Sequence, residues 1–157
     1  MPWRLPAADG PLLEAALDGG RLRLHLANDL DGIAASLPML EAFCAEAGLS
    51  PRVANRLEVV VEEVVSNAIR HGFAPGSAQS VRVEASATAE AVLLVFEDDG
   101  VAFDPLAQAP PAPFTDLESA QIGGLGIATV RRLAAQVRYF GGAGGFPVNR
   151  LEVTLAR

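Results

Sequence analysis

The stretch that decides the fold reads Glu58-Val-Val-Val-Glu-Glu-Val-Val-Ser-Asn-Ala-Ile-Arg-His-Gly72. Its apolar side chains recur at the spacing of one helix face, at about 100° per residue. This apolar stripe consists of Leu57, Val60, Val61, Val64 and Ala68. Glu63, Asn67 and Arg70 fall together on one flank of the stripe, whereas Glu58 and Glu62 fall on the other. The pattern predicts an amphipathic helix with a carboxylate and a carboxamide one turn apart.

Asn67 is the residue of this helix that most needs an explanation. Asparagine is a mediocre helix former, and a buried amide without a partner costs about 1–3 kcal/mol. One interpretation is a structural asparagine that caps the helix or is anchored in the core. The other is an amide that binds a ligand. The helix by itself favours the structural interpretation, and two motifs further along the chain favour the ligand.

Composition limits the classes of protein to consider. The 157 residues are enough for one domain with a real core, and the apolar fraction of 50% is typical of a folded chain. The chain shows neither an apolar run long enough to cross a bilayer nor a secretory signal, so we expect a cytoplasmic protein without membrane contact. The single cysteine, Cys44, excludes an internal disulfide. The net charge of −7 argues against direct binding to nucleic acid.

The order of the expected elements predicts an α+β fold. Strands are expected at 21–26, 80–85, 91–96, 137–140 and 150–155, with His25 facing solvent. Helices are expected up to Gly48, from Ser50-Pro51 to Gly72, and at 127–136. Residues 1–20 are predicted to be a loose N-terminal arm or a short extra element. These elements predict a two-layer α/β sandwich, with helices on one face of a mixed, mostly antiparallel sheet.

Two further motifs follow the long helix. The first is Glu97-Asp-Asp-Gly-Val-Ala-Phe-Asp-Pro105, in which a carboxylate ends a buried strand beside a glycine turn. It is either an ordinary Asp-Gly turn or a place where backbone closely approaches a flat ligand. The second is Gly123-Gly124-Leu125-Gly126, which opens a helix. It is either a plain junction or a phosphate site at a helix N-terminus.

Together and in this order, the three motifs resemble the N, G1 and G2 boxes of the GHKL ATP-binding superfamily, whose fold is also called the Bergerat fold. The string Glu62-Glu-Val-Val-Ser-Asn-Ala-Ile-Arg-His-Gly-Phe73 and the short layout resemble bacterial anti-sigma-factor serine/threonine kinases of the RsbW type. The resemblance covers roughly residues 21–156. It implies that residues 21–157 form an ATP-binding domain, with an ATP lid at about 104–122.

The resemblance also assigns roles to individual residues. Asn67 is similar to the family's Mg²⁺ ligand, and a carboxamide oxygen is a suitable donor for that ion. Glu63 is similar to the general base that takes the proton from a substrate serine or threonine. Asp98 is similar to the carboxylate that accepts the adenine amino group, and Gly100 to the glycine that admits the base. The other residues that the resemblance places at the ATP or ADP are Arg70, Ala102, Phe103, Gly123, Gly124, Leu125 and Gly126.

Two departures from the family pattern bear on catalysis. Ala102 stands where the G1 box usually has glycine, so an extra methyl lies near the nucleotide. The lid often ends in an acidic-Arg pair, whereas this chain reads Glu118-Ser-Ala-Gln121. An arginine near a γ-phosphate neutralises developing charge, so its absence is unfavourable for phosphoryl transfer.

The sequence therefore supports two functions. The first is an ATP-binding anti-sigma factor that phosphorylates its antagonist, a STAS-type protein, and binds a sigma factor. The alternative is a switch module that binds its partner without catalysis and holds a nucleotide as a structural ligand. The resemblance adds a possible homodimer to either function.

Overall fold

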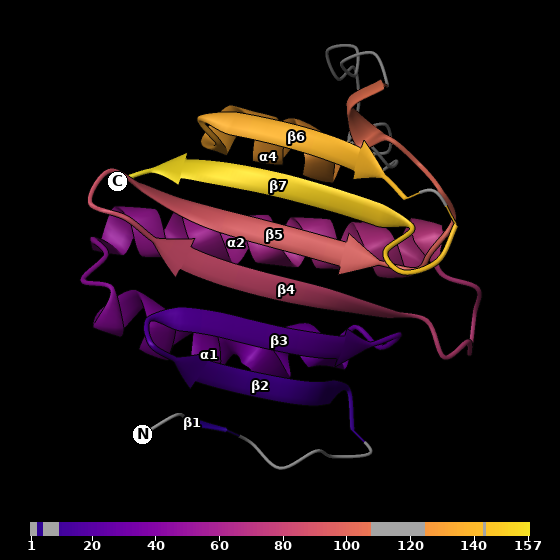
Figure 1. Ribbon diagram of the computed structural model, residues 1–157, viewed down its shortest axis with the longest axis horizontal. Helices are drawn as coiled ribbons and strands as arrows, with labels where there is room; N and C mark the ends of the chain where they lie inside the picture. The colour runs from indigo at the N-terminus through magenta and orange to yellow at the C-terminus, as the bar shows by residue number, and fades with distance from the viewer. Residues whose placement is uncertain (1–2, 5–9, 108–124, 143) are drawn as a thin grey trace, which may run out of the picture.

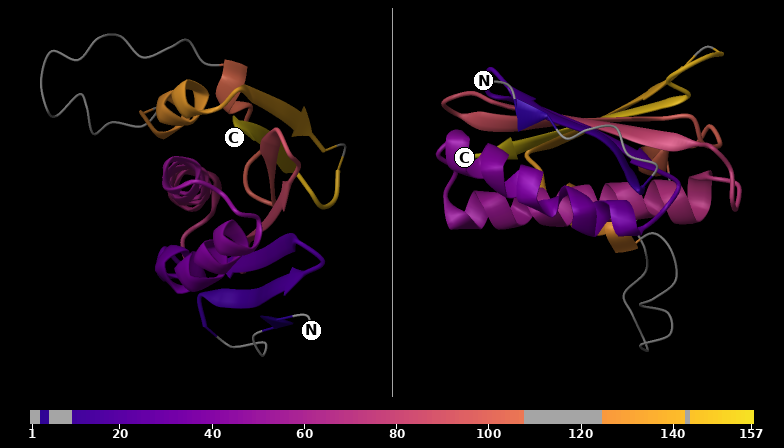
Figure 2. Two further views of the ribbon diagram at one scale, coloured as in Figure 1. Left: turned by 90° about the vertical axis from the view of Figure 1, so that its left-hand side faces the viewer. Right: turned by 90° about the horizontal axis from the view of Figure 1, so that it is seen from below.

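The computed structural model describes residues 3–4, 10–107, 125–142 and 144–157 and arranges them as a sheet with helices on one face (Figure 1). The seven strands follow the order β1-β2-β3-β4-β5-β7-β6. They are β1 (Trp3–Arg4), β2 (Leu12–Asp18), β3 (Arg21–Ala27), β4 (Ser80–Ala87), β5 (Ala91–Asp98), β6 (Gln136–Gly141) and β7 (Asn149–Ala156). The helices α1 (Asp31–Glu46), α2 (Pro51–Asn67) and α4 (Leu125–Leu133) cover the same side (Figure 2). This arrangement confirms the predicted two-layer α+β sandwich.

The sheet is antiparallel in every described pair of strands, whereas the sequence predicts a mixed sheet. The reason lies in the order of the last strands. β5 and β6 run in the same direction, because both are antiparallel to β7. β7 returns from β6 and lies between β5 and β6. These two strands would have formed a parallel pair as direct neighbours, and each is instead antiparallel to β7.

The sheet also begins earlier in the chain than the predicted strand at 21–26. β2 pairs with β3 from Leu12↔Leu26 to Asp18↔Arg21, so this part of the N-terminal segment is a strand of the sheet. Its burial does not alternate, because Ala15, Ala16 and Leu17 are all buried in succession. A shift in register between Leu12 and Glu14 also interrupts the period of two.

The long helix α2 begins where the sequence predicts, at Ser50 and Pro51, but its α-helical part ends at Asn67 rather than at the predicted Gly72. The Val53 N–H donates to Ser50 Oγ at 3.2 Å, and Pro51 occupies the first helical position. Beyond Asn67 the chain continues as one π-helical turn, η1 (Ala68–Gly72), before it leaves the helix at Phe73. π-helical turns of this kind are frequent at functional sites.

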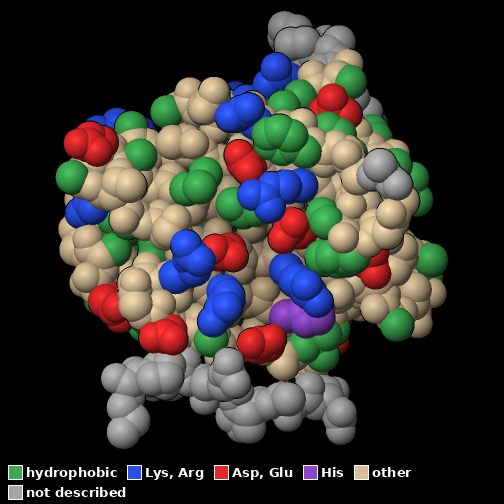
Figure 3. Space-filling model, viewed as in Figure 1, with side chains coloured by type: hydrophobic (Ala, Val, Ile, Leu, Met, Phe, Trp, Pro, Cys, Tyr) green, Lys and Arg blue, Asp and Glu red, His purple; other side chains and the backbone are tan. Residues whose placement is uncertain are grey.

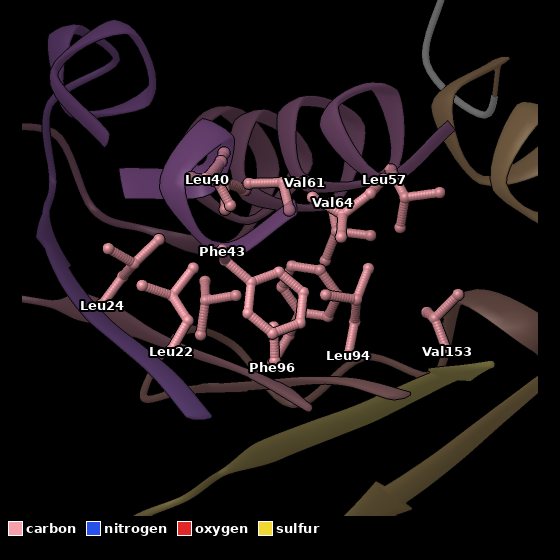
Figure 4. Packing of buried hydrophobic residues seen from close by; sticks show 14 of the residues in the cluster. Leu22, Leu24, Leu40, Phe43, Leu57, Val61, Val64, Leu94, Phe96 and Val153 are labelled. Carbon is pink, nitrogen blue, oxygen red and sulfur yellow. The ribbon is translucent and has the colours of Figure 1, made fainter. Parts of the chain in front are cut away.

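The predicted apolar stripe of α2 forms the centre of the core. Leu57, Val60 and Val61 are fully buried, and Val64 is nearly so. Figure 4 shows Leu57, Val61 and Val64 packed above side chains from the sheet and from α1; the labelled partners are Leu22, Leu24, Leu40, Phe43, Leu94, Phe96 and Val153. Cys44 is buried in the same cluster, and burial raises the pKa of its thiol to about 11, as expected of an unreactive cysteine.

The open face of the sheet, away from the helices, carries charges of both signs (Figure 3). Arg150 pairs with Glu97 on the neighbouring strand β5 at 3.2 Å and with Glu152 on its own strand β7 at 2.8 Å. His25 is half-buried there and shares a 2.7 Å hydrogen bond with Ser80 Oγ, so it is less exposed than predicted. No helix in the described parts of the chain is both long and apolar enough to cross a bilayer.

Candidate functional site

A cavity of about 160 Å³ lies between the C-terminal end of α2 with η1 and the end of the sheet where β5 stops and β7 starts. Most of its lining is apolar and comes from both layers, including Val64, Val81, Phe96, Ile127 and Leu151. The polar groups are few and converge from different elements: Asn67 from α2, His71 from η1, Asp98 from β5, Tyr139 from β6 and Asn149 from β7. Apolar walls with a few placed polar groups are typical of a small-molecule site.

Asp98 is the half-buried carboxylate of this cavity. Its Oδ1 accepts hydrogen bonds from the Gly100 N–H at 2.8 Å and from Asn149 Nδ2 at 3.0 Å. Burial raises the pKa of the carboxyl, because it removes water from the charged form, and these two hydrogen bonds act in the opposite direction. Both bonds end on Oδ1, so Oδ2 is available to accept a bond from a ligand amino group.

Gly100 is required by the packing of its own turn. A Cβ at this position would lie 2.8 Å from the Gly72 carbonyl oxygen and 3.1 Å from Asp98 Oδ1. The next residue, Val101, donates its N–H to the same Gly72 oxygen at 2.9 Å. The backbone that comes close to Gly100 is therefore that of Gly72, at the end of the helical segment. This contact fixes the Asp98 turn against η1.

Asn149 is a site residue that sequence reasoning missed. Its Nδ2 donates to Asp98 Oδ1 at 3.0 Å and to the Val101 carbonyl at 2.9 Å. Its Oδ1 accepts from the Tyr139 hydroxyl at 2.6 Å and from the Phe103 N–H at 3.0 Å. One amide therefore links the turn after β5 to the hairpin of β6 and β7. The signal that could have identified it is the register Asp98↔Asn149, which appears only once the strands are paired.

Asn67 and Glu63, which the sequence places on one flank of the helix, line different hollows. Asn67 lines the cavity. Glu63, one turn earlier, lines a separate groove between α1 and α2, and Arg70 lines the same groove. The Glu63 carboxylate lies against the first turn of α4, since a Cβ built on Gly126 would come within 2.6 Å of Glu63 Oε2. The structure therefore brings the first and third motifs together at Glu63 and Gly126.

The remaining predicted residues lie around the mouth of the cavity or outside the described residues. Phe103 is exposed and lines the cavity. Ala102 is exposed beside it and is not among the residues that line the cavity. Leu125 begins α4, and Gly123, Gly124 and most of the predicted lid at 104–122 lie outside the described residues. The described start of that segment contains a short 3₁₀ turn, η2 (Pro105–Ala107).

The cavity has apolar walls and a fixed carboxylate, which are features of a small-molecule site, and the first turn of α4 lies beside Glu63. Residues 26–149 match the histidine kinase-like ATPase domain family. This match spans well over half of the chain, so the protein belongs to that family, which is part of the GHKL superfamily. Membership of an ATPase domain family implies nucleotide binding, in agreement with the geometry of the site.

Two known proteins are similar to this chain. The serine/threonine-protein kinase BtrW of Bordetella bronchiseptica is 28% identical over 104 residues, which are 66% of this chain and 73% of BtrW. Among solved structures, the histidine kinase domain of the Erythrobacter litoralis EL346 blue-light activated histidine kinase is 16% identical, with a TM-score of 0.45. That match covers 88% of this chain and 68% of the other.

Proposed function

We propose that the protein binds ATP in the cavity and transfers its γ-phosphate to a serine or threonine of a partner protein. The observation that carries the proposal is the placement of Asp98, Asn67 and Glu63. Asp98 and Asn67 line the cavity, whereas Glu63 lies one helical turn before Asn67 and against the first turn of α4. The similarity to BtrW, which is named a serine/threonine-protein kinase, supports the same reaction.

Each of these residues has a chemical task that its surroundings permit. Asp98 accepts a hydrogen bond from the adenine amino group through its free oxygen. Asn67, which lines the cavity, would offer a carboxamide oxygen to Mg²⁺. Bound ATP supplies the phosphoryl group. Glu63 takes the proton from the acceptor hydroxyl while the hydroxyl oxygen bonds to the γ-phosphorus and the bond to ADP breaks.

The start of α4 is the part of the described site that faces the phosphates in this proposal. Its first turn has backbone N–H groups without helical partners and the positive end of a helix dipole. Gly126 lies in that turn, against Glu63. A negative phosphate chain and the proposed base would then meet at one place. Gly123 and Gly124 extend the same role outside the described residues.

The proposed partners are proteins, and the proposed place of action is the cytoplasm. The phosphate acceptor is an anti-sigma-factor antagonist of the STAS type, and the regulated protein is a sigma factor. Phosphorylation of the antagonist would leave the protein free to hold its sigma factor. The motif string around Asn67 supports this assignment, and the net charge of −7 agrees with regulation through protein rather than nucleic acid. A homodimer is part of the proposal.

One observation favours a second candidate function, a switch that binds nucleotide without catalysis. All 12 basic residues of the chain are arginines, and none lies between Arg82 and Arg131. The lid and the segment leading to the third motif therefore contain no cation to neutralise charge on the γ-phosphate. In this alternative, nucleotide binding alone sets the conformation that the partner recognises.

Label transfer from radiolabelled ATP separates the two functions. The protein is incubated with Mg²⁺ and candidate antagonist proteins, and the label on each is followed. We expect transfer to one antagonist, its loss in Glu63→Gln, and normal transfer in Glu90→Gln, which changes an exposed carboxylate in the turn between β4 and β5. ATP binding without transfer to any antagonist would favour the switch.

A further inference from the structure

A groove of about 500 Å³ runs between α1 and α2 and shares no lining residue with the cavity. The two helices lie side by side over the sheet (Figure 2). Buried Leu40 and Val61 contribute to its lining. Leu30, Ile33 and Leu37 line the α1 side at the spacing of one helix face. Leu30 and Leu37 are each 38% exposed, so the groove presents an apolar strip to solvent.

The α2 side of the groove is mainly acidic. Glu58, Glu62 and Glu63 line it, and the one basic residue among the lining residues is Arg70. Glu62 is exposed, and Glu58 and Glu63 are half-buried. The groove therefore combines an apolar strip with a row of carboxylates beside it. This combination is complementary to a segment with apolar side chains flanked by positive charges.

We propose that this groove is where the phosphoacceptor protein docks, through a helix with apolar side chains flanked by lysines or arginines. The inference rests on the proposed kinase function and adds the chemistry of the substrate surface. Glu63 connects the two, because it lines the groove while its carboxylate lies against α4. A segment in the groove would bring a neighbouring hydroxyl to Glu63, whose carboxylate lies beside the start of α4, where the proposed function places the phosphates.

Charge distinguishes this occupant from a second copy of the same chain. A two-fold dimer through this surface would bring two copies of the acidic row into one interface, with Arg70 as the one basic lining residue of each copy. Like charges in contact are unfavourable, and the whole chain carries a net charge of −7. An anionic membrane surface would be repelled for the same reason. A partner segment with positive charges would instead be attracted to the carboxylates of the groove.

The test uses a defined peptide probe and matched variants. The probe is a fluorescein-labelled alanine-based helix with one serine, leucines at i, i+3 and i+7, and flanking lysines. Its control has glutamate at every lysine. Fluorescence anisotropy should show saturable binding of the lysine peptide to wild type, weaker at high salt, and little binding of the glutamate peptide. Glu62→Lys and Leu37→Gln should each weaken binding by about threefold to tenfold, as for moderate interface residues.

Two variants outside the groove provide matched controls. Glu90→Lys makes the same charge change at an exposed turn, and Leu93→Gln changes a leucine that is also 38% exposed but lies on β5. Both should bind the lysine peptide like wild type. The inference is overturned if wild type shows no saturable binding, if the glutamate peptide binds equally well, or if the controls weaken binding as much as the groove variants do.

The kinase proposal and the groove proposal can fail separately. If the lysine peptide binds as expected and wild type transfers no phosphate to any antagonist, the kinase proposal falls and the groove remains a docking surface. If an antagonist is phosphorylated and its KM is unchanged in Glu62→Lys and Leu37→Gln, the groove proposal is wrong and the kinase proposal still holds. A thermal-shift measurement with ATP should give the wild-type response in all four variants, which confirms that they are folded.

Discussion

Two hollows beside α2 differ in the side chains that line them. The one at Asn67 is a largely apolar cavity that contains a carboxylate fixed by Asn149 and the Gly100 N–H. On the side of Glu63, an open groove combines exposed leucines with a row of acids. Two residues four apart in one helix therefore line different hollows of the molecule. Their spacing by itself would suggest a single shared site.

The largest effect is expected on the rate of phosphoryl transfer, and it tests the role of Glu63. Glu63→Gln keeps the shape of the side chain and its capacity for hydrogen bonding but removes the base. The rate of transfer at saturating ATP and acceptor should fall by about 10²–10⁴-fold, the usual contribution of a positioned base. Single-turnover measurements with labelled ATP give this rate. A variant as fast as wild type would show that Glu63 is not the base.

Asp98→Asn should have the next largest effect, on ATP affinity. The substitution replaces an acceptor with a group that can present a donor to the adenine amine, and hydrogen bonds to charged groups contribute about 1.5–3 kcal/mol. Affinity measured by calorimetry should therefore fall by about 10- to 100-fold. Asp99→Asn is the matched control, because Asp99 accepts from the Ser80 N–H and does not line the cavity. Equal losses in both variants would contradict the role of Asp98.

Tyr139→Phe should have a smaller effect on the same side of α2. It removes the 2.6 Å hydrogen bond from the Tyr139 hydroxyl to Asn149 Oδ1, which helps to orient the Asn149 amide toward Asp98. A typical hydrogen bond contributes about 0.5–1.5 kcal/mol, so ATP affinity should fall by about twofold to tenfold. Calorimetry measures the loss, and the retained ring preserves the apolar wall. Unchanged affinity would mean that Asn149 is held adequately by its other partners.

Ala102→Gly should have the smallest effect. Ala102 is exposed and lies outside the cavity lining, so the methyl that departs from the family pattern has little to obstruct. ATP affinity should stay within about twofold of wild type, as for most surface substitutions. A marked loss in calorimetry would show that the methyl makes a contact with the nucleotide.

The fold could be predicted from the sequence wherever local chemistry decides it. Ser50 caps α2 as predicted, because capping acts within a few residues. The apolar stripe of α2 predicted the buried face for the same reason. β2 was not predicted, because its burial does not alternate. The antiparallel sheet depends on where β7 inserts, and no local pattern determines that position.

The site was predictable only in part, for a related reason. Asp98 and Asn67 lie in motifs that can be read along the chain, and both line the cavity. Asn149 comes to the site through the register of β5 and β7, 51 residues after Asp98. The contact of Glu63 with Gly126 also depends on how α2 packs against α4. Side chains that meet through tertiary packing leave no sequence signal until the elements are placed.

The most direct test of the division at α2 is a comparison of ATP affinities for Asn67→Ala and Glu63→Gln by calorimetry, with and without Mg²⁺. Asn67→Ala should bind ATP more weakly than wild type when Mg²⁺ is present and equally well when the ion is chelated. Glu63→Gln should match wild type in both conditions. If both variants lose the same affinity, the two residues serve one site, and the account of a nucleotide side and an acceptor side is wrong.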